Sequence, residues 1–245
     1  MKKLRPDHKV TSQSKRDLAR KITVFKMSKG FLQIQEEDIR KLALYAVPCS
    51  FKKGEVIFLE GDPCDYFYII QKGRVKCFKE SPSGKRLIIL IGKRHETLNA
   101  GVLFGGHPHI FSAKAMDETI LLRIDRSVYL SWVQENPAVL QRVLALIEQA
   151  LGSAYNKLIN IIGERVEHRV CVVLYMLYGK FGCDLNFTCS EIAELAGTTT
   201  ETVIRVVSKL KKNRIVASTR KRIEILNPDE IKMLSREQPQ THGWV

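Results

Sequence analysis

The part of this sequence that most constrains its fold runs over residues 187–226. Apolar residues follow Ser190 at helical spacing, and Gly197 then supplies the left-handed conformation in which helices commonly end. Ser190 is placed to cap this first helix, and Thr199 to cap a second one directly after the turn. A lysine-rich stretch and a short hairpin come next. Two short helices joined by a tight turn and followed by a hairpin predict a winged helix-turn-helix, a device that reads DNA.

The second helix of this motif, predicted over residues 200–212, separates a polar face from an apolar one. The apolar stripe would hold the helix to its domain and consists of Val203, Val206, Val207 and Leu210. The opposite face would enter the major groove of DNA. The residues that we expect to contact DNA are Ser190, Thr199, Thr200, Glu201, Ile204, Arg205, Lys209, Lys211 and Lys212.

The charge of the chain supports the same partner. Forty lysines and arginines oppose 26 acidic residues, and the net charge of +14 predicts a polyanionic partner. One basic cluster surrounds the predicted helix-turn-helix, where phosphate contact is expected; it comprises Arg205, Lys209, Lys211, Lys212, Arg214, Arg220, Lys221 and Arg222. A second cluster fills residues 1–29, which hold ten basic residues and two acidic ones. This N-terminal cluster is either a solvated face or a further contact with a polyanion.

Length and composition predict two modest domains. A chain of 245 residues with 44% hydrophobic residues is large enough for two separate cores. The N-terminus lacks the apolar core of a signal peptide, and no segment is apolar enough to cross a membrane, so we expect a cytoplasmic protein without a membrane partner. The six cysteines lack zinc-ligand spacing and are expected to be reduced and mostly buried.

The first half of the chain predicts a short helix and then a β-domain. Residues 36–44 have the spacing of an amphipathic helix. Short β-rich runs separated by glycine turns follow, and they are expected to form strands at 56–58, 66–70, 73–78, 87–91 and 119–124. An antiparallel barrel or jelly roll is the fold that such strands form most readily.

A long helix is predicted over residues 137–163. Its apolar residues step by four and three along a seam of coiled-coil type that comprises Leu140, Leu144, Ile147, Leu151, Ala154, Leu158 and Ile161. The seam would pack either against the β-domain of the same chain or against a second copy. A helix-turn-helix behind it favours a homodimer on a palindromic operator, with half-sites about 34 Å apart.

Three runs carry a family resemblance: GEVIFLEGD at 54–62, YIIQKGRVK at 68–76 and ETVIR at 201–205. Asn136-Pro137 lies between the second run and the third. In this order they resemble the superfamily of the cyclic-AMP receptor protein and the fumarate-nitrate reduction regulator (CRP/FNR). The resemblance implies an α+β protein with a double-stranded β-helix (jelly-roll) sensor of the cyclic-nucleotide-binding type, a dimerisation helix and a winged helix-turn-helix. It runs from about Phe31 to the end and places the β-roll at 31–136, the dimer helix at 137–166 and the DNA-binding domain at 167–245, with a hinge near 164–168. Residues 1–30, which precede it, are expected to form a basic extension.

By the same resemblance Glu201 and Arg205 contact bases, and their chemistry suits one shared G·C pair, since arginine bonds guanine and glutamate accepts from cytosine. The alternative is an ion pair between these two residues on the helix surface. The implied partners are double-stranded DNA, a second copy and, in an activator, RNA polymerase. Thr200 stands where the cyclic-AMP receptor protein has an arginine, and Ile204 stands where the oxygen-sensing branch has a serine. The other bases of the half-site are therefore not predicted.

The effector is not determined by the resemblance. Segment 98–114 has no arginine or carboxylate to hold a cyclic nucleotide, and Ala154 and Tyr155 stand where cyclic-AMP sensors contact adenine, which argues against cyclic AMP. No cysteine precedes Cys49, so an iron-sulfur cluster of the oxygen-sensing type lacks its ligands; Cys49, Cys64 or Cys77 as redox thiols stay open. The residues expected to line the effector pocket are Phe104, His107, His109, Ser112, Lys114, Ala154 and Tyr155.

Two alternatives involve the histidines of this segment. Phe104 and His107 resemble in spacing the haem-ligand region of the carbon-monoxide-sensing branch, so His107 is a possible haem ligand, although both histidines also suit exposed positions in a turn. His107 and His109 also resemble the metal motif of cupin enzymes, but the further ligands are missing, so no catalytic residue and no enzyme activity is expected. A ligand-binding module that regulates a protein instead of DNA is the remaining rival.

Overall fold

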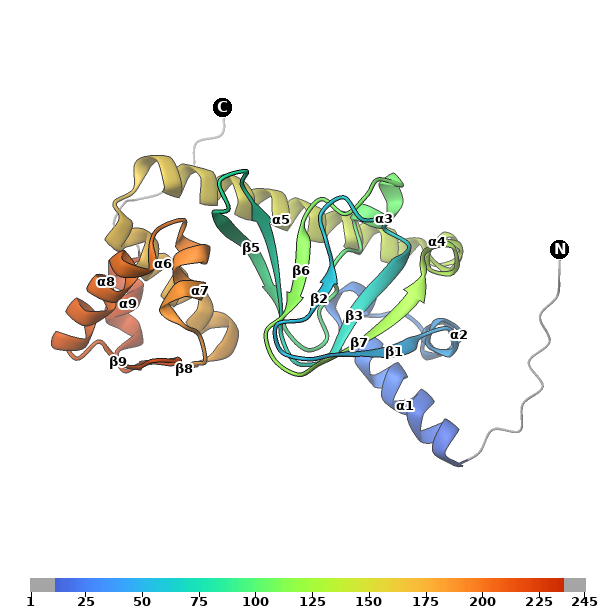
Figure 1. Ribbon diagram of the computed structural model, residues 1–245. Coiled ribbons are helices and arrows are strands. Elements are labelled where there is room, and N and C mark those ends of the chain that lie inside the picture. The colour runs from blue at the N-terminus through green and yellow to red at the C-terminus, as the bar shows by residue number, and fades with distance from the viewer. Residues whose placement is uncertain (1–11, 236–245) are drawn as a thin grey trace. The chain divides into compact units, whose positions relative to one another are not determined.

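The structure of the protein is a computed structural model that describes residues 12–235 (Figure 1). The chain divides into two compact units. The first unit comprises residues up to 78 and residues 90–150, and the second comprises residues 79–89 and those from 151 onward. The predicted basic residues Lys2, Lys3, Arg5 and Lys9 lie outside the described residues.

The first unit is built around a β-roll. One sheet has the strand order β1-β7-β3 and the other β2-β6-β4-β5. The pairs β1–β7, β3–β7, β2–β6 and β4–β6 are antiparallel, as expected of a jelly roll. The strands are β1 Val47–Phe51, β2 Val56–Phe58, β3 Tyr66–Lys72, β4 Val75–Glu80, β5 Arg86–Gly92, β6 Ser112–Ala115 and β7 Thr119–Asp125. The predicted fold class is therefore confirmed, although sequence patterns missed β1 and β6.

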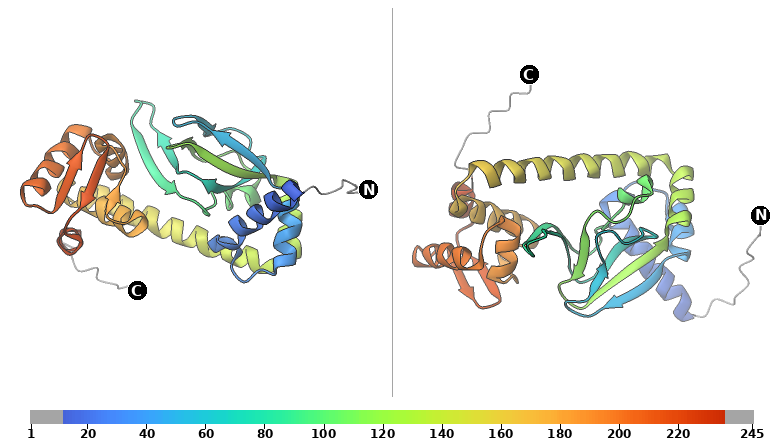
Figure 2. Two further views of the ribbon diagram at one scale, coloured as in Figure 1. Left: turned by 90° about the horizontal axis from the view of Figure 1, so that it is seen from below. Right: turned by 45° about the horizontal axis from the view of Figure 1, so that its top comes forward.

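Helices cover one end of the roll (Figures 1 and 2). They are α1 Ser12–Lys26, the short 3-10 helix Lys29–Phe31, α2 Glu36–Leu44, α3 Val102–Gly105, α4 Arg126–Glu135 and the first part of α5 Pro137–Gly163. The helix predicted at 36–44 is confirmed, and α1 and α4 are additions to the prediction.

An aromatic cluster joins these helices to the sheet. Phe31 packs edge-on against Phe25 of α1, with ring centroids 5.1 Å apart, and Phe67 of β3 stacks on Tyr129 of α4 at 4.2 Å. The indole nitrogen of Trp132 donates to the Asp38 carbonyl at 2.8 Å, which ties α4 to α2. Buried aromatic area therefore contributes to the stability of this end of the unit.

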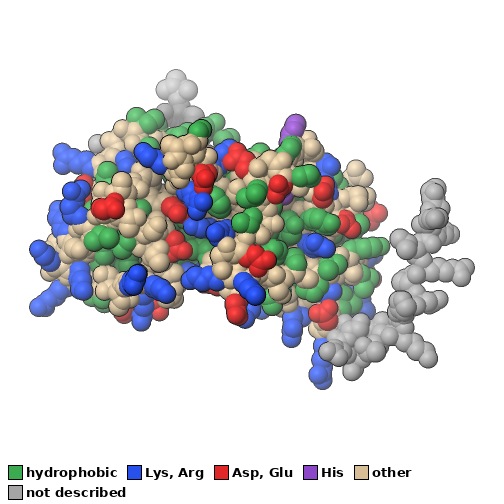
Figure 3. All heavy atoms as spheres, in the orientation of Figure 1, with side chains coloured by type: hydrophobic (Ala, Val, Ile, Leu, Met, Phe, Trp, Pro, Cys, Tyr) green, Lys and Arg blue, Asp and Glu red, His purple; other side chains and the backbone are tan. Residues whose placement is uncertain are grey.

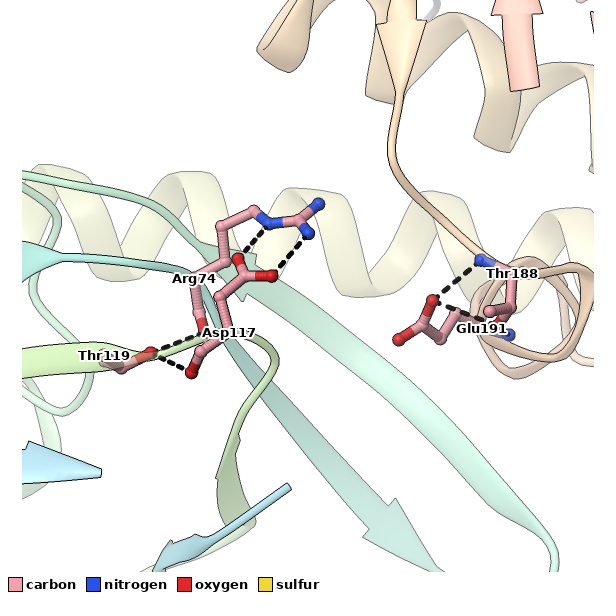
Figure 4. Close-up of polar contacts among 5 residues, drawn as sticks. All are labelled: Arg74, Asp117, Thr119, Thr188 and Glu191. Carbon is pink, nitrogen blue, oxygen red and sulfur yellow. Dashed lines mark hydrogen bonds and ion pairs between the residues drawn. The ribbon is translucent and has the colours of Figure 1, made fainter. Parts of the chain in front are cut away.

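The turn at Gly73 is held by a polar clamp (Figure 4). Gly73 has φ +87°, and a Cβ placed there would lie 2.5 Å from Thr119 Oγ1, so only glycine fits. Arg74 donates from Nε and Nη2 to the two carboxylate oxygens of Asp117, at 2.6 and 2.9 Å, and this guanidinium lowers the pKa of Asp117. The Thr119 hydroxyl donates to the Asp117 carbonyl at 3.0 Å.

The second unit contains the C-terminal part of the chain and the tip of the β4–β5 hairpin. Its elements are the rest of α5, α6 Val166–Phe181, β8 Asp184–Leu185, α7 Cys189–Ala196, α8 Thr200–Lys212, β9 Val216–Thr219, β10 Arg222–Ile225 and α9 Pro228–Leu234. The strands β8, β10 and β9 form a small sheet in this order, in which β8 lies against α6 and β9 against α8. Lys157 of α5 donates to the Ile88 carbonyl of the hairpin.

Helix α5 ends at Gly163 and α6 begins at Val166, so only Glu164 and Arg165 separate them. The predicted start at Pro137 agrees with the structure, and the residues from 166 on, which we expected to belong to a hinge, form the first turn of α6. No helix within residues 12–235 is long and apolar enough to span a membrane.

Candidate nucleic-acid interface

The first helix of the helix-turn-helix is capped by Thr188. The Thr188 side chain accepts a hydrogen bond from the Glu191 backbone N–H at 3.2 Å, and the Glu191 carboxylate accepts one from the Thr188 N–H at 2.8 Å (Figure 4). This reciprocal pair is a capping box. The prediction that Ser190 caps the helix was wrong, because only Thr188 has a glutamate three residues later; Ser190 lies exposed in the first turn of α7.

The capping box makes a direct comparison possible. Thr188→Ala removes the acceptor for the Glu191 N–H and is expected to lower the free energy of unfolding by about 1 kcal/mol. Ser190→Ala, two residues away, is the matched control and should change it by less than about 0.5 kcal/mol. Thermal unfolding of the two variants beside the wild type measures the difference. Equal effects of the two substitutions would contradict the assignment of the cap.

The turn and the second helix agree with the prediction. Gly197 has φ +63°, the left-handed conformation expected at the end of α7. Thr199 caps α8 by accepting from the Thr202 N–H at 3.3 Å. The predicted apolar stripe is buried, and its members are Val203, Val206, Val207 and Leu210. The opposite face of α8 therefore projects away from the domain.

That projecting face carries the predicted base-contacting residues. Glu201, Ile204 and Arg205 are exposed, and Ile204 keeps 51% of its area accessible. Thr200 at the helix start is half-buried. Ser208 is also exposed and lies one turn beyond Ile204, so it belongs to the same row. Sequence reasoning omitted Ser208, although its spacing from Ile204 was sufficient to find it.

Glu201 and Arg205 are both available for a ligand. The Glu201 backbone N–H and the Thr199 side chain hold the pKa of the Glu201 carboxyl below its usual value, so the group is an ionised acceptor at neutral pH. Within residues 12–235 no ion pair joins Glu201 to Arg205. The alternative of a surface ion pair on α8 is thus not formed in this structure.

A basic surface flanks this row. Lys209, Lys211 and Lys212 are exposed in the last turn of α8, and Arg220 and Lys221 are exposed at the tip of the β9–β10 hairpin. Lysine and arginine side chains gather over this end of the second unit in Figure 3. Five cations around a projecting helix suit contact with a phosphate backbone.

Arg222 departs from the predicted cluster. Its Nε donates to Asp184 Oδ1 at 2.6 Å, and its Nη2 lies 3.6 Å from Glu224 Oε2. This arginine is therefore occupied by two carboxylates within the small sheet. We therefore assign Arg222 to contacts within the β8-β10-β9 sheet and not to phosphate contact.

Arg169 is a positioning residue that sequence reasoning missed. From α6 its guanidinium donates to four backbone carbonyls, those of Ile161 and Glu164 at 3.2 Å, Ala196 at 3.1 Å and Gly197 at 3.2 Å. These carbonyls lie at the C-terminal ends of α5 and α7, where helix carbonyls lack intrahelical partners. One side chain thus joins the end of the long helix to the helix-turn-helix.

The predicted seam of α5 is exposed on the single chain. Leu144 is 57% exposed, Leu151 50% and Leu158 55%, whereas Val139 and Val143 on another side of the helix are buried in the core of the first unit. Leu140 and Ile147 are also exposed, as is Ala154, and Ile161 is half-buried. Helix α5 therefore has one apolar face buried in the core of the first unit and a second apolar face exposed to solvent.

The predicted effector residues have different environments. His109 is buried and stacks on Phe58, with ring centroids 3.6 Å apart, and burial lowers its pKa against the opposing effect of Asp62 and Asp65. The expectation that both histidines lie exposed in a turn was wrong for His109, because Phe58 covers it; His107 is exposed.

The other predicted effector residues are not all available either. The Ser112 hydroxyl accepts from the Glu60 N–H at 2.9 Å and is buried. Phe104 is 37% exposed, and Lys114 is half-buried on β6. Ala154 and Tyr155 lie on α5 in the second unit, and both are exposed.

Two chemical alternatives find little support. Burial raises the pKa of the Cys49 and Cys64 thiols, which disfavours the reactive thiolate, and Cys77 is buried. Among the residues that the structure describes, no group of three or more His, Cys, Asp or Glu side chains is placed to hold a metal ion. His107 accordingly has no neighbouring ligand set of this kind.

Comparison with known proteins assigns both parts of the chain. Residues 48–136 match the cyclic nucleotide-binding domain family, and residues 168–234 match the Crp-like helix-turn-helix domain family. The chain is 27% identical over 186 residues to the CRP-like cAMP-activated global transcriptional regulator of Mycobacterium tuberculosis. The matched region covers 73% of this chain and 83% of that protein. It is 29% identical to the cyclic AMP receptor protein of Thermus thermophilus, over 76% of this chain and 87% of that protein.

Solved structures show the same architecture. FixK2 from Bradyrhizobium japonicum superposes with a TM-score of 0.71 at 22% identity, over 77% of this chain and 96% of that one. The catabolite activator protein of Thermus thermophilus gives a TM-score of 0.51 at 25% identity, over 85% of this chain and 98% of that one. The order of β-roll, long helix and helix-turn-helix is thus shared with proteins of divergent sequence.

Proposed function

Because this chain belongs to the CRP/FNR superfamily and is a DNA-binding transcription regulator, not an enzyme, we propose that two copies of it read a palindromic operator. The observation that carries this proposal is the projecting face of α8. It presents Glu201 and Arg205 on a helix whose opposite side is buried. The surrounding lysines and the hairpin tip supply phosphate contacts.

The proposed base contacts follow from hydrogen-bond chemistry. Arg205 would donate to guanine O6 and N7, and the ionised Glu201 would accept from cytosine N4. The two residues lie one helical turn apart and are suited to a single G·C pair. Ile204 would contact a thymine methyl group through its exposed side chain.

The dimer is supported by the uncovered apolar face of α5. A row of half-exposed leucines along one helix costs free energy in water, and a second copy of the same helix would bury it. A two-fold axis along this seam would present two recognition helices to two half-sites. A cytoplasmic location and, in an activator, contact with RNA polymerase belong to the same proposal.

The roll is proposed to bind an effector other than cyclic AMP. Segment 98–114 contains neither an arginine nor a carboxylate, and Ser112 is occupied by the backbone of Glu60. Phe104, His107 and Lys114 of the first unit are retained as effector contacts in this proposal. Effector binding would shift the population between arrangements of the chain through α5, to whose end Arg169 connects α7. Calorimetry is expected to detect no heat of binding for cyclic AMP; a saturable signal would overturn this part.

Haem bound through His107 remains testable by one spectrum. The spectrum is taken of the protein expressed with adequate haem, and the absence of a Soret band would remove haem from the candidate effectors. A Soret band that shifts with carbon monoxide and disappears in His107→Ala would instead make the roll a haem-based gas sensor.

The experiment that tests DNA reading compares two variants. Fluorescence anisotropy would follow binding of the full-length protein to a duplex selected from a random-sequence library and to a scrambled duplex. Arg205→Ala is expected to cost about 1 to 3 kcal/mol on the selected duplex and to relax discrimination at one base pair. Lys211→Ala should weaken both duplexes alike and reduce the salt dependence. Equal losses on both duplexes for Arg205→Ala would remove its role in reading bases.

A further inference from the structure

Helix α1 presents two arginines side by side to solvent. Arg16 and Arg20 are four residues apart, so they lie on the same face one turn from each other, and both are exposed. Leu18, Ile22 and Phe25 follow the opposite face and pack in the core of the first unit. In Figures 1 and 2 the helix runs out beyond the edge of the roll. The arginine face is therefore accessible along this unit.

The two arginines lack acidic partners within residues 12–235. Asp17 pairs with Lys21 at 3.1 Å, and Glu36 pairs with Lys26 at 2.6 Å, so the nearby carboxylates are already used by lysines. Like charges at this spacing repel one another and weaken a helix slightly. An anion bound between Arg16 and Arg20 would relieve that repulsion.

The character of the surface selects the class of anion. A membrane-bound amphipathic helix needs a free apolar face, and the apolar face of α1 is used by the roll. The exposed residues between Lys15 and Thr23 include no aromatic or large apolar side chain of the kind that anchors protein interfaces. Guanidinium groups without apolar anchors suit phosphate oxygens.

We infer that the outer face of α1 is a second DNA-contacting surface, in which Arg16 and Arg20 bind backbone phosphates without reading bases. The inference rests on the proposed function, since DNA held by α8 raises the local concentration of phosphate around the rest of the protein. This surface adds affinity and salt dependence but no sequence preference.

The test uses the full-length protein and a random-sequence duplex, so it does not depend on the operator. Arg16→Gln/Arg20→Gln removes two charges from α1, and Lys52→Gln/Lys53→Gln removes two exposed charges elsewhere on the roll as the matched control. Binding is measured by anisotropy between about 50 and 200 mM salt. The slope of log K against log salt is expected to become shallower by about 1.8 per protomer in the arginine variant and to stay unchanged in the control.

Either of two results would overturn the inference. If the arginine variant kept the wild-type slope, the surface would belong to another partner, such as an acidic protein. If the control lowered the slope equally, only net charge would matter. Failure of the proposed function has a different signature, because the wild type would then not prefer the selected duplex and Arg205→Ala would have no selective effect.

Discussion

Leu151→Asp is expected to convert the protein from a dimer to a monomer. Leu151 is the central residue of the seam and is 50% exposed on the single chain, so in the proposed dimer it would be buried against its counterpart. A carboxylate there would have no partner, and an uncompensated buried charge costs about 3 to 5 kcal/mol. The dissociation constant of the dimer should therefore rise by more than about 100-fold.

Sedimentation velocity at several concentrations measures this change. Asn156→Asp is the matched control, because it adds the same charge on the opposite, exposed side of α5 and should leave the dimer intact. Far-ultraviolet circular dichroism would confirm that both variants are folded. A Leu151→Asp protein that still sedimented as a dimer would show that the copies associate through a different surface.

Arg169→Ala is expected to lower both the stability of the second unit and its affinity for DNA. The substitution removes donors to four carbonyls at the ends of α5 and α7. Hydrogen bonds from charged groups contribute about 1.5 to 3 kcal/mol each, but these share one side chain and partial access to water, so the expected total is about 2 to 3 kcal/mol. The helix-turn-helix should then lose its fixed connection to α5.

Thermal unfolding and hydrogen exchange of the α7 amides measure this loss. Arg169→Lys is expected to recover only part of it, since one ammonium group cannot reach four carbonyls from the position of a planar guanidinium. Arg165→Ala removes an exposed arginine at the start of α6 and serves as the control. If Arg169→Ala and Arg165→Ala unfolded alike, the four hydrogen bonds would not contribute to the connection.

Features that depend on neighbours in the chain were predicted well. The bounds of α8, the end of α7 at Gly197 and the start of α5 at Pro137 follow from helical spacing, capping and proline, all of which act within a few residues. The Thr188 cap was local too, and its spacing from Glu191 was a sufficient signal. The two short strands β1 and β6 were missed because neither has a run of β-branched or aromatic residues: β1 contains Pro48, and β6 consists of small residues and a lysine.

By itself the sequence determined that this chain has a β-roll, a long helix with an apolar seam, and a helix-turn-helix that presents Glu201 and Arg205, because periodicity and capping encode these elements locally. Only the tertiary structure decided that Phe58 covers His109 and that Asp184 occupies Arg222. The same holds for the contacts of Arg169 with Ala196 and Gly197. Each of these contacts joins residues more than twenty-five positions apart, and chain folding brings them together through packing that no local pattern records.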